Sequence, residues 1–283
     1  MEKLREAQDL CLLTKPTQTR STSLAISTSG QEYIAGKIES WNHILTISSE
    51  LAALTLATVQ QDYLIKAIHT YVDVDTIEDE ISPATIKLLI DHARRTGIDI
   101  SYTVYNKSGE KVFETLSCQT QFPFYQPKTT ILTKVTNASP QQNWLTTNIG
   151  SPIQLKEYCI KGSNLAFTTS NTSTAYGSCV VTKSGKIFWG GQYSSYDHRH
   201  NLHAEMVAII STIMLCREPI IYLGILSTKH QETSCNMCGI CRQFLLEICT
   251  MLESSPQIIT FALQTEEHHI YDLNNYLPAS WST

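Results

Sequence analysis

The chain has 283 residues, of which 42% are hydrophobic and 17% charged, with only 12 glycines and 9 prolines. This composition excludes a disordered, collagen-like or low-complexity protein, and the length suits two modest domains. The 21 basic and 26 acidic residues give a net charge of -5 without any lysine- or arginine-rich run. We therefore expect no nucleic-acid partner.

Nine cysteines are present. Their odd number, and the lack of a recognisable export signal in the first residues, favour a reducing compartment over a disulfide framework. The longest apolar stretch, from Met206 to Cys216, contains Ser211 and Thr212 and is too short to cross a bilayer. We expect a cytoplasmic protein with no membrane partner, in which clustered cysteines indicate metal binding or catalysis.

In chain order, the first half opens with a helical segment and continues with a hairpin whose turn is Thr28-Ser29-Gly30. An apolar helical pattern then begins with an acid at Glu50. A further helical segment starts at Ser82 and ends before Gly97. Strands are expected between these helices.

The second half repeats these landmarks at a nearly constant spacing. The turn glycine Gly185 follows Gly30 by 155 residues, and the acid Glu205 follows Glu50 by the same number. Near the two ends, Leu277-Pro278-Ala279 matches Phe122-Pro123-Phe124. The repeat predicts two tandem copies of one fold, 1–125 and 153–283, joined by a linker over 126–152. The alternative is a single irregular domain with coincidental turns.

Two segments of the second half, Ile220 to Leu226 and Ile258 to Leu263, are almost continuously apolar. Such runs are typical of strands that are buried on both faces of a sheet. Because helical segments separate them, we expect an α/β fold. Each copy should be a three-layer α/β/α sandwich with a mixed sheet.

Only the second copy carries a metal-type constellation. It contains His203-Ala204-Glu205 and, further along, Cys238-Gly239-Ile240-Cys241. One histidine and two cysteines in a C-x-x-C spacing give three zinc ligands and leave a fourth position for water, as in catalytic zinc sites. Alternatively, Cys235, Cys238 and Cys241 could form a structural zinc site or be buried thiols.

These motifs resemble those of the cytidine deaminase family, in which H-x-E is followed by P-C-x-x-C. The resemblance extends from about Gly177 to Trp281. It implies one Zn²⁺ per chain, held by His203, Cys238 and Cys241. It also implies hydrolytic deamination of cytidine or deoxycytidine in pyrimidine salvage, with Glu205 as the proton shuttle. A small-molecule nucleoside is then the substrate, and the two-domain form of the family implies a homodimer.

At the 155- and 154-residue offsets, the positions in the first copy that match the three ligands are Ser48, Ala84 and Lys87. None of these is a good zinc ligand. Glu50 remains in place of Glu205, but it has no activated water to serve. The first copy is therefore expected to be a degenerate, structural domain.

The candidate substrate contacts are Gln192, Tyr193, Ser194 and Ala204. The family's ribose-binding N-x-E aligns with Gln192-Tyr193-Ser194, and its P-Y-S-x-F segment is absent from residues 170–174. Because the ribose clamp differs, two alternatives stay open. The substrate could be a modified cytosine or an aminonucleoside antibiotic, or the chain could be a non-catalytic, zinc-stabilised interaction protein.

Several other polar and aromatic side chains lie near the motifs in the sequence. His198 and His200 are expected to be solvated or to gate the site rather than to bind metal. Tyr193 and Tyr196 could stack on a base or pack in the core. Arg242 is expected to hydrogen-bond a ligand thiolate.

Overall fold

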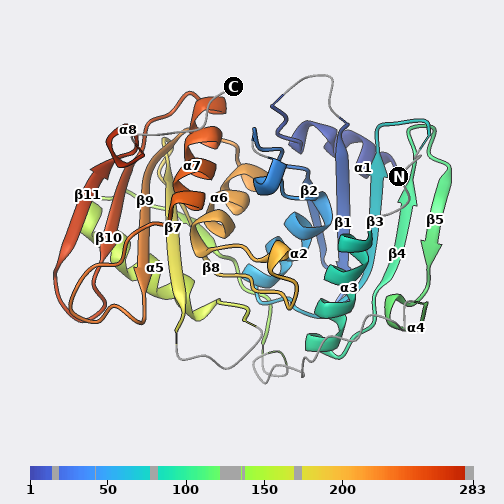
Figure 1. Ribbon diagram of the computed structural model, residues 1–283, viewed down its shortest axis with the longest axis horizontal. Coiled ribbons are helices and arrows are strands. Elements are labelled where there is room, and N and C mark those ends of the chain that lie inside the picture. The colour runs from blue at the N-terminus through green and yellow to red at the C-terminus, as the bar shows by residue number, and fades with distance from the viewer. Residues whose placement is uncertain are drawn as a thin grey trace. The chain divides into compact units, whose positions relative to one another are not determined.

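The computed structural model describes residues 1–14, 19–41, 43–76, 82–121, 135, 138–168 and 174–277. The chain forms two compact units, each with its own sheet (Figure 1). The first unit comprises Met1–Gln141 together with Ser195–His200, and the second comprises Gln142–Ser194 with Asn201–Thr283. The matched segments Phe122-Pro123-Phe124 and Pro278-Ala279 lie outside the described residues.

The first unit contains the following elements: α1 (Glu2–Glu6), η1 (Ala7–Leu10), β1 (Ser21–Ser27), β2 (Glu32–Gly36), η2 (His43–Leu45), α2 (Ser49–Val59), β3 (Ile65–Val72), α3 (Pro83–Thr96), β4 (Ser101–Tyr105), β5 (Lys111–Thr115) and α4 (Cys118–Gln121). The short helix η5 (His198–His200) also belongs to it. Its sheet has the strand order β2-β1-β3-β4-β5.

The second unit contains β6 (Trp144–Thr146), η4 (Pro152–Gln154), α5 (Leu155–Asn164), β7 (Tyr176–Thr182), β8 (Lys186–Gly191), α6 (Ala204–Leu215), β9 (Ile220–Ser227), α7 (Gly239–Met251), β10 (Gln257–Phe261), β11 (His268–Asp272) and α8 (Leu273–Tyr276). Its sheet has the order β11-β10-β9-β7-β8-β6.

The two sheets have the same topology apart from the extra edge strand β6. In each unit a hairpin pairs antiparallel with the next strand, which pairs parallel with a fourth strand, and a fifth strand adds antiparallel at the edge. The parallel pairs, β3 with β4 and β9 with β10, are connected through α3 and α7. The predicted mixed sheet is therefore confirmed, and the two equivalent sheets are consistent with the predicted duplication. The edge strands β5 and β11 were not anticipated from the sequence.

Helices cover both faces of the sheet in the second unit. Cys159 of α5 packs with Cys179 and Val181 of β7 on one face. A Cβ atom at Gly190 of β8 would lie 2.7 Å from Val207 of α6, so α6 covers the other face. Adjacent strand residues point to opposite faces. The unit is thus the predicted three-layer α/β/α sandwich.

The first unit has the same three layers. Leu4 of α1 packs against Leu24 of β1. The neighbouring residue, Ser23, hydrogen-bonds Ser49 of α2 over 2.7 Å, which places α2 on the opposite face. The α1 layer is much shorter than α5, its counterpart in the second unit.

Glycines fix two features that the second unit needs. Gly185 turns the β7–β8 hairpin with φ +83°, as Gly30 turns the β1–β2 hairpin with φ +87°. At Gly177, a Cβ atom would lie 1.9 Å from the carbonyl oxygen of Cys159. Only glycine therefore allows α5 to approach β7 so closely.

The structure corrects the expected linker. Trp144–Thr146, inside the stretch 126–152, pairs antiparallel with β8 as strand β6. The Trp144 ring stacks on Phe188 at 5.9 Å between centroids. The second unit therefore begins at Gln142 rather than at 153.

None of the helices in the described residues is both long and apolar enough to cross a bilayer.

A buried ion pair on α3 binds residues 195–200, a segment of the first unit that is about a hundred residues away in the sequence. Asp91 and Arg95 of α3 have side chains that are 0% exposed, and they lie 3.0 Å apart. The same Asp91 oxygen accepts hydrogen bonds from the Ser195 hydroxyl at 2.9 Å and from the Tyr196 backbone N–H at 3.3 Å. This carboxylate thus ties residues 195–200 to α3.

Replacing Asp91 with alanine should destabilise the first unit strongly, because Arg95 would remain buried without its carboxylate. We expect a loss of about 3–5 kcal/mol in the free energy of unfolding, measured by urea denaturation. The matched control is Glu157→Ala, which removes the half-exposed i,i+4 ion pair with Lys161 on α5. That variant should lose no more than about 0.5 kcal/mol. Equal losses for both variants would contradict this role of Asp91.

Candidate metal centre

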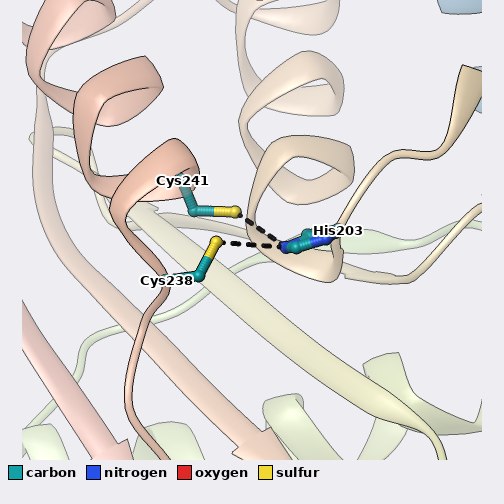
Figure 2. A group of neighbouring side chains, drawn as sticks. All are labelled: His203, Cys238 and Cys241. Atoms are coloured by element: carbon teal, nitrogen blue, oxygen red, sulfur yellow. Dashed lines mark hydrogen bonds between the residues drawn. The ribbon is translucent and has the colours of Figure 1, made fainter. Parts of the chain in front are cut away.

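Three potential metal ligands meet where two helices of the second unit begin. His203 is the N-cap residue of α6, and Cys238 is the N-cap residue of α7, both with extended backbone. Cys241 lies in the first turn of α7. The helices α6 and α7 lie side by side on one face of the sheet (Figure 1). Their aligned N-terminal ends bring the three side chains together (Figure 2).

The geometry of this group suits a single metal ion. His203 Nδ1 lies 3.3 Å from both Cys238 Sγ and Cys241 Sγ, and the three donor atoms are all within 4.8 Å of one another. Bond lengths of about 2.0 Å for Zn–N and 2.3 Å for Zn–S, at a tetrahedral angle, require an N···S separation of about 3.5 Å. An imidazole and two thiols are also donors that bind zinc, whereas hard cations such as Mg²⁺ and Ca²⁺ prefer oxygen donors. The residues present therefore fit zinc.

The electrostatic surroundings favour a thiolate at Cys238. The hydrogen bond from the Cys241 thiol, with a second contribution from His203, lowers the pKa of Cys238 to about 4. The N-terminus of α7 adds its positive dipole end. The pKa of His203 is raised by its hydrogen bond with Cys238. Cys241, which is 0% exposed, has a pKa well above its usual value because of its bond to Cys238 and its burial.

Glu205 lies beside the metal ligands without being one of them. It occupies the first turn of α6, and it is only 2% exposed. Burial raises the pKa of its carboxyl group above the usual value. Its side chain is within hydrogen-bonding reach of Cys241. A buried carboxyl group with a raised pKa can both accept and return a proton near neutral pH.

A pocket of about 300 Å³ opens onto this centre, at the lower end of the range for small-molecule sites. It is lined by Tyr176, Gln192, Ser194, Asn201, Leu202, His203, Glu205, Ile225, Asn236 and Cys238. All of these residues belong to the second unit. The pocket therefore places a metal ligand pair and a buried carboxyl group against one small cavity.

The four predicted substrate contacts have different positions. Gln192 and Ser194 line the pocket. The ring of Tyr193 is 1% exposed and stacks on Phe167 at 5.4 Å between centroids, so it packs in the core instead. Ala204 is 0% exposed at the start of α6 and does not line the pocket.

The other candidates are not among the three residues of the metal group. The thiol of Cys235 is buried and is not part of the His203–Cys238–Cys241 group. His198 and His200 belong to the first unit. Arg242 donates a hydrogen bond to the Tyr276 carbonyl and lies 4.7 Å from the centre of that ring. It therefore orders α8 against α7, which differs from the expected bond to a ligand thiolate.

Sequence reasoning missed several pocket residues. Asn201 and Asn236 each lie two residues before a ligand, His203 and Cys238, so their spacing could have pointed to them. Tyr176 comes from β7, and its position follows only from the order of the strands. Residues 170–174, which align with the family's P-Y-S-x-F segment, lie outside the described residues except for Thr174.

The first unit keeps the carboxylate but surrounds it differently. Ser48 caps α2 as His203 caps α6, and its side chain accepts a hydrogen bond from the Leu51 N–H. Oε1 of Glu50 accepts hydrogen bonds from the Tyr102 hydroxyl at 2.7 Å and from the Thr70 hydroxyl at 3.0 Å. Glu50 is thus engaged in a buried hydroxyl network.

The helix caps also correct two of the expected equivalents. Ser82 caps α3 as Cys238 caps α7, so the positions that match the cysteines are Ser82 and Thr85 rather than Ala84 and Lys87. Neither is a favoured zinc ligand. Within the part of the chain that the structure describes, the metal-type group is confined to the second unit.

Comparison with known proteins gives partial structural matches. A cytidine deaminase from Burkholderia pseudomallei is 18% identical, with a TM-score of 0.41, over 46% of this chain and 99% of that one. A cytidine deaminase from Mycobacterium tuberculosis is 17% identical, with a TM-score of 0.37, over 46% of this chain and 96% of that one. One from Mycobacterium leprae is 16% identical, with a TM-score of 0.36, over 44% and 95%. Neither protein-family models nor curated proteins give a match.

Replacing Cys238 with serine should remove zinc from the protein. Changes next to a ligand already cost about 10–100-fold in metal affinity, and loss of a ligand should cost at least as much. We expect about one zinc per chain in the unaltered protein after dialysis against a weak chelator, and little in Cys238→Ser, measured by elemental analysis.

The matched control is Cys235→Ser, three residues away and outside the metal group. It should retain its zinc. Loss of zinc in Cys235→Ser but not in Cys241→Ser would instead favour a structural site built on Cys235.

Proposed function

We propose that the second unit is a zinc-dependent hydrolytic deaminase of cytosine nucleosides, converting cytidine or deoxycytidine to the uracil compound and ammonia. The observation that carries this proposal is the buried carboxyl group of Glu205, which shares one small pocket with His203 and Cys238. A purely structural metal site needs neither a pocket nor a carboxyl group with a raised pKa.

His203, Cys238 and Cys241 would hold the zinc, since their donor atoms face one another (Figure 2). Three protein ligands leave one position of a tetrahedral site open toward the pocket. When bound there, zinc supplies Lewis-acid activation of a water molecule.

Glu205 would move the protons of the reaction. Its carboxylate takes a proton from the attacking water as the C4–O bond forms, and it gives that proton to N3 of the cytosine ring. It then takes the remaining hydroxyl proton and passes it to the amino nitrogen, so that the C4–N bond breaks and ammonia leaves. The burial of Glu205 supports this role, because it brings the pKa of the carboxyl group closer to neutral pH.

A different cytosine compound as substrate is the second candidate. Gln192 and Ser194 line the pocket, and they align with the residues that bind ribose in the family that this unit resembles. A modified cytosine nucleoside or an aminonucleoside could occupy a pocket with these neutral side chains. Strong turnover of plain cytidine would argue against this candidate.

The Glu205→Gln variant should retain zinc and lose activity. General acid–base catalysis contributes about 10²–10⁴-fold to rate, so kcat should fall by about that factor. The release of ammonia from cytidine or deoxycytidine, followed by enzyme-coupled assay, measures it.

The tandem fold offers a matched control. Glu50→Gln makes the same change at the equivalent position of the first unit, where the carboxylate is bound by Tyr102 and Thr70. It should leave kcat within about twofold of the unaltered protein. An active Glu205→Gln variant would contradict the assignment of the proton shuttle.

A further inference from the structure

The orientation of Gln192 in the pocket is fixed by the backbone. Its Oε1 accepts a hydrogen bond of 2.8 Å from the N–H of Tyr176. Because a backbone N–H can only donate, the oxygen rather than the NH₂ group must face it. The backbone of Gln192 is also held, since its carbonyl accepts from the Phe167 N–H at 2.7 Å. The part of this side chain that is left for a ligand is therefore a donor.

The side-chain amide of Asn236 is also oriented by a hydrogen bond to its oxygen. Its Oδ1 accepts a hydrogen bond of 3.3 Å from the hydroxyl group of Tyr276. That hydroxyl oxygen itself accepts from the Met237 N–H at 3.1 Å, so its single proton is directed to Asn236. The NH₂ group of Asn236 is again what remains for a ligand. Two amides of the pocket wall thus have their carbonyl oxygens engaged by the protein.

Carboxylates are scarce in the same wall. Among the described residues that line the pocket, Glu205 is the only acid, and it lies at the metal centre. The segments 169–173 and 278–283 contain neither Asp nor Glu in the sequence. Among the described residues, the pocket wall thus has no carboxylate besides Glu205 that could accept a hydrogen bond from a sugar hydroxyl.

We propose that the amide NH₂ groups of Gln192 and Asn236 recognise hydrogen-bond acceptors of the substrate, and that the pocket does not require sugar hydroxyl groups. The substrate class is then cytosine compounds in general, including those without 2′- and 3′-hydroxyls. This inference rests on the proposed deaminase activity and specifies its substrate range.

The size of the expected effect follows from the chemistry of the wall. A site built to hydrogen-bond a substrate hydroxyl rejects the analogue that lacks it by about 10⁴–10⁵-fold, because its own buried polar groups are left unpaired. A hydroxyl that only accepts from a neutral amide contributes about 10-fold or less. Removal of the hydroxyls should therefore change kcat/KM by no more than about 10-fold.

The test compares kcat/KM for cytidine and for 2′,3′-dideoxycytidine on the zinc-loaded full chain. We expect a ratio within about 10-fold. A preference for cytidine above 10-fold, with turnover intact, would overturn this inference and leave the deaminase standing. Absence of ammonia release from both compounds, and from deoxycytidine and free cytosine, would overturn the proposed activity and this inference with it.

A second variant tests the donor directly. Gln192→Glu keeps an oxygen that accepts from the Tyr176 N–H and replaces the remaining NH₂ with a carboxylate oxygen. A sugar hydroxyl could then donate to it, so the ratio of kcat/KM for cytidine over dideoxycytidine should rise at least about 10-fold. The matched control is Gln257→Glu, which makes the same change at an exposed position at the start of β10. Equal ratios in the two variants would contradict the role assigned to Gln192.

Discussion

The candidate site depends on one constraint, which is the convergence of two helix N-termini on the same face of a mixed sheet. α6 delivers His203 at its cap and Glu205 two residues later, while α7 delivers Cys238 at its cap and Cys241 in its first turn. The parallel pair β9 and β10 fixes α7, because a crossover connection must return across one face of the sheet. The helix ends also favour the thiolate that a metal ion needs. The sheet thus positions the chemistry without contributing a ligand.

The duplicated fold separates what supports this arrangement from what makes it reactive. Both units have a carboxylate at the second position of the equivalent helix, Glu50 in α2 and Glu205 in α6. Glu50 is bound by two hydroxyl groups, from Tyr102 and Thr70. The position that matches Thr70 is Ile225, which lines the pocket beside Glu205 and cannot hydrogen-bond it. The same backbone therefore holds a structural carboxylate in one copy and a candidate proton shuttle in the other.

Much of this arrangement could be predicted from the sequence because its signals are local. Glycine turns, apolar strands and the spacing of His203, Cys238 and Cys241 all report on short segments. The three-residue strand β6 has too little pattern to be distinguished from a linker, and its pairing with β8 and the packing of Trp144 on Phe188 are contacts between segments distant in the sequence. The positions of Tyr176 and Ile225 in the pocket depend on strand order. Whether Tyr193 faced a ligand or the core depended on its packing against Phe167. Assembly into a homodimer stays a prediction.

The central claim is that one zinc ion is held by His203, Cys238 and Cys241 with a fourth position open to the pocket. X-ray absorption spectroscopy at the zinc K-edge of the full chain tests it most directly. The account predicts one zinc per chain with two sulfur ligands at about 2.3 Å and two nitrogen or oxygen ligands at about 2.0–2.1 Å. Three or four sulfur ligands would indicate a closed structural site, and a protein that binds no zinc would contradict the account altogether.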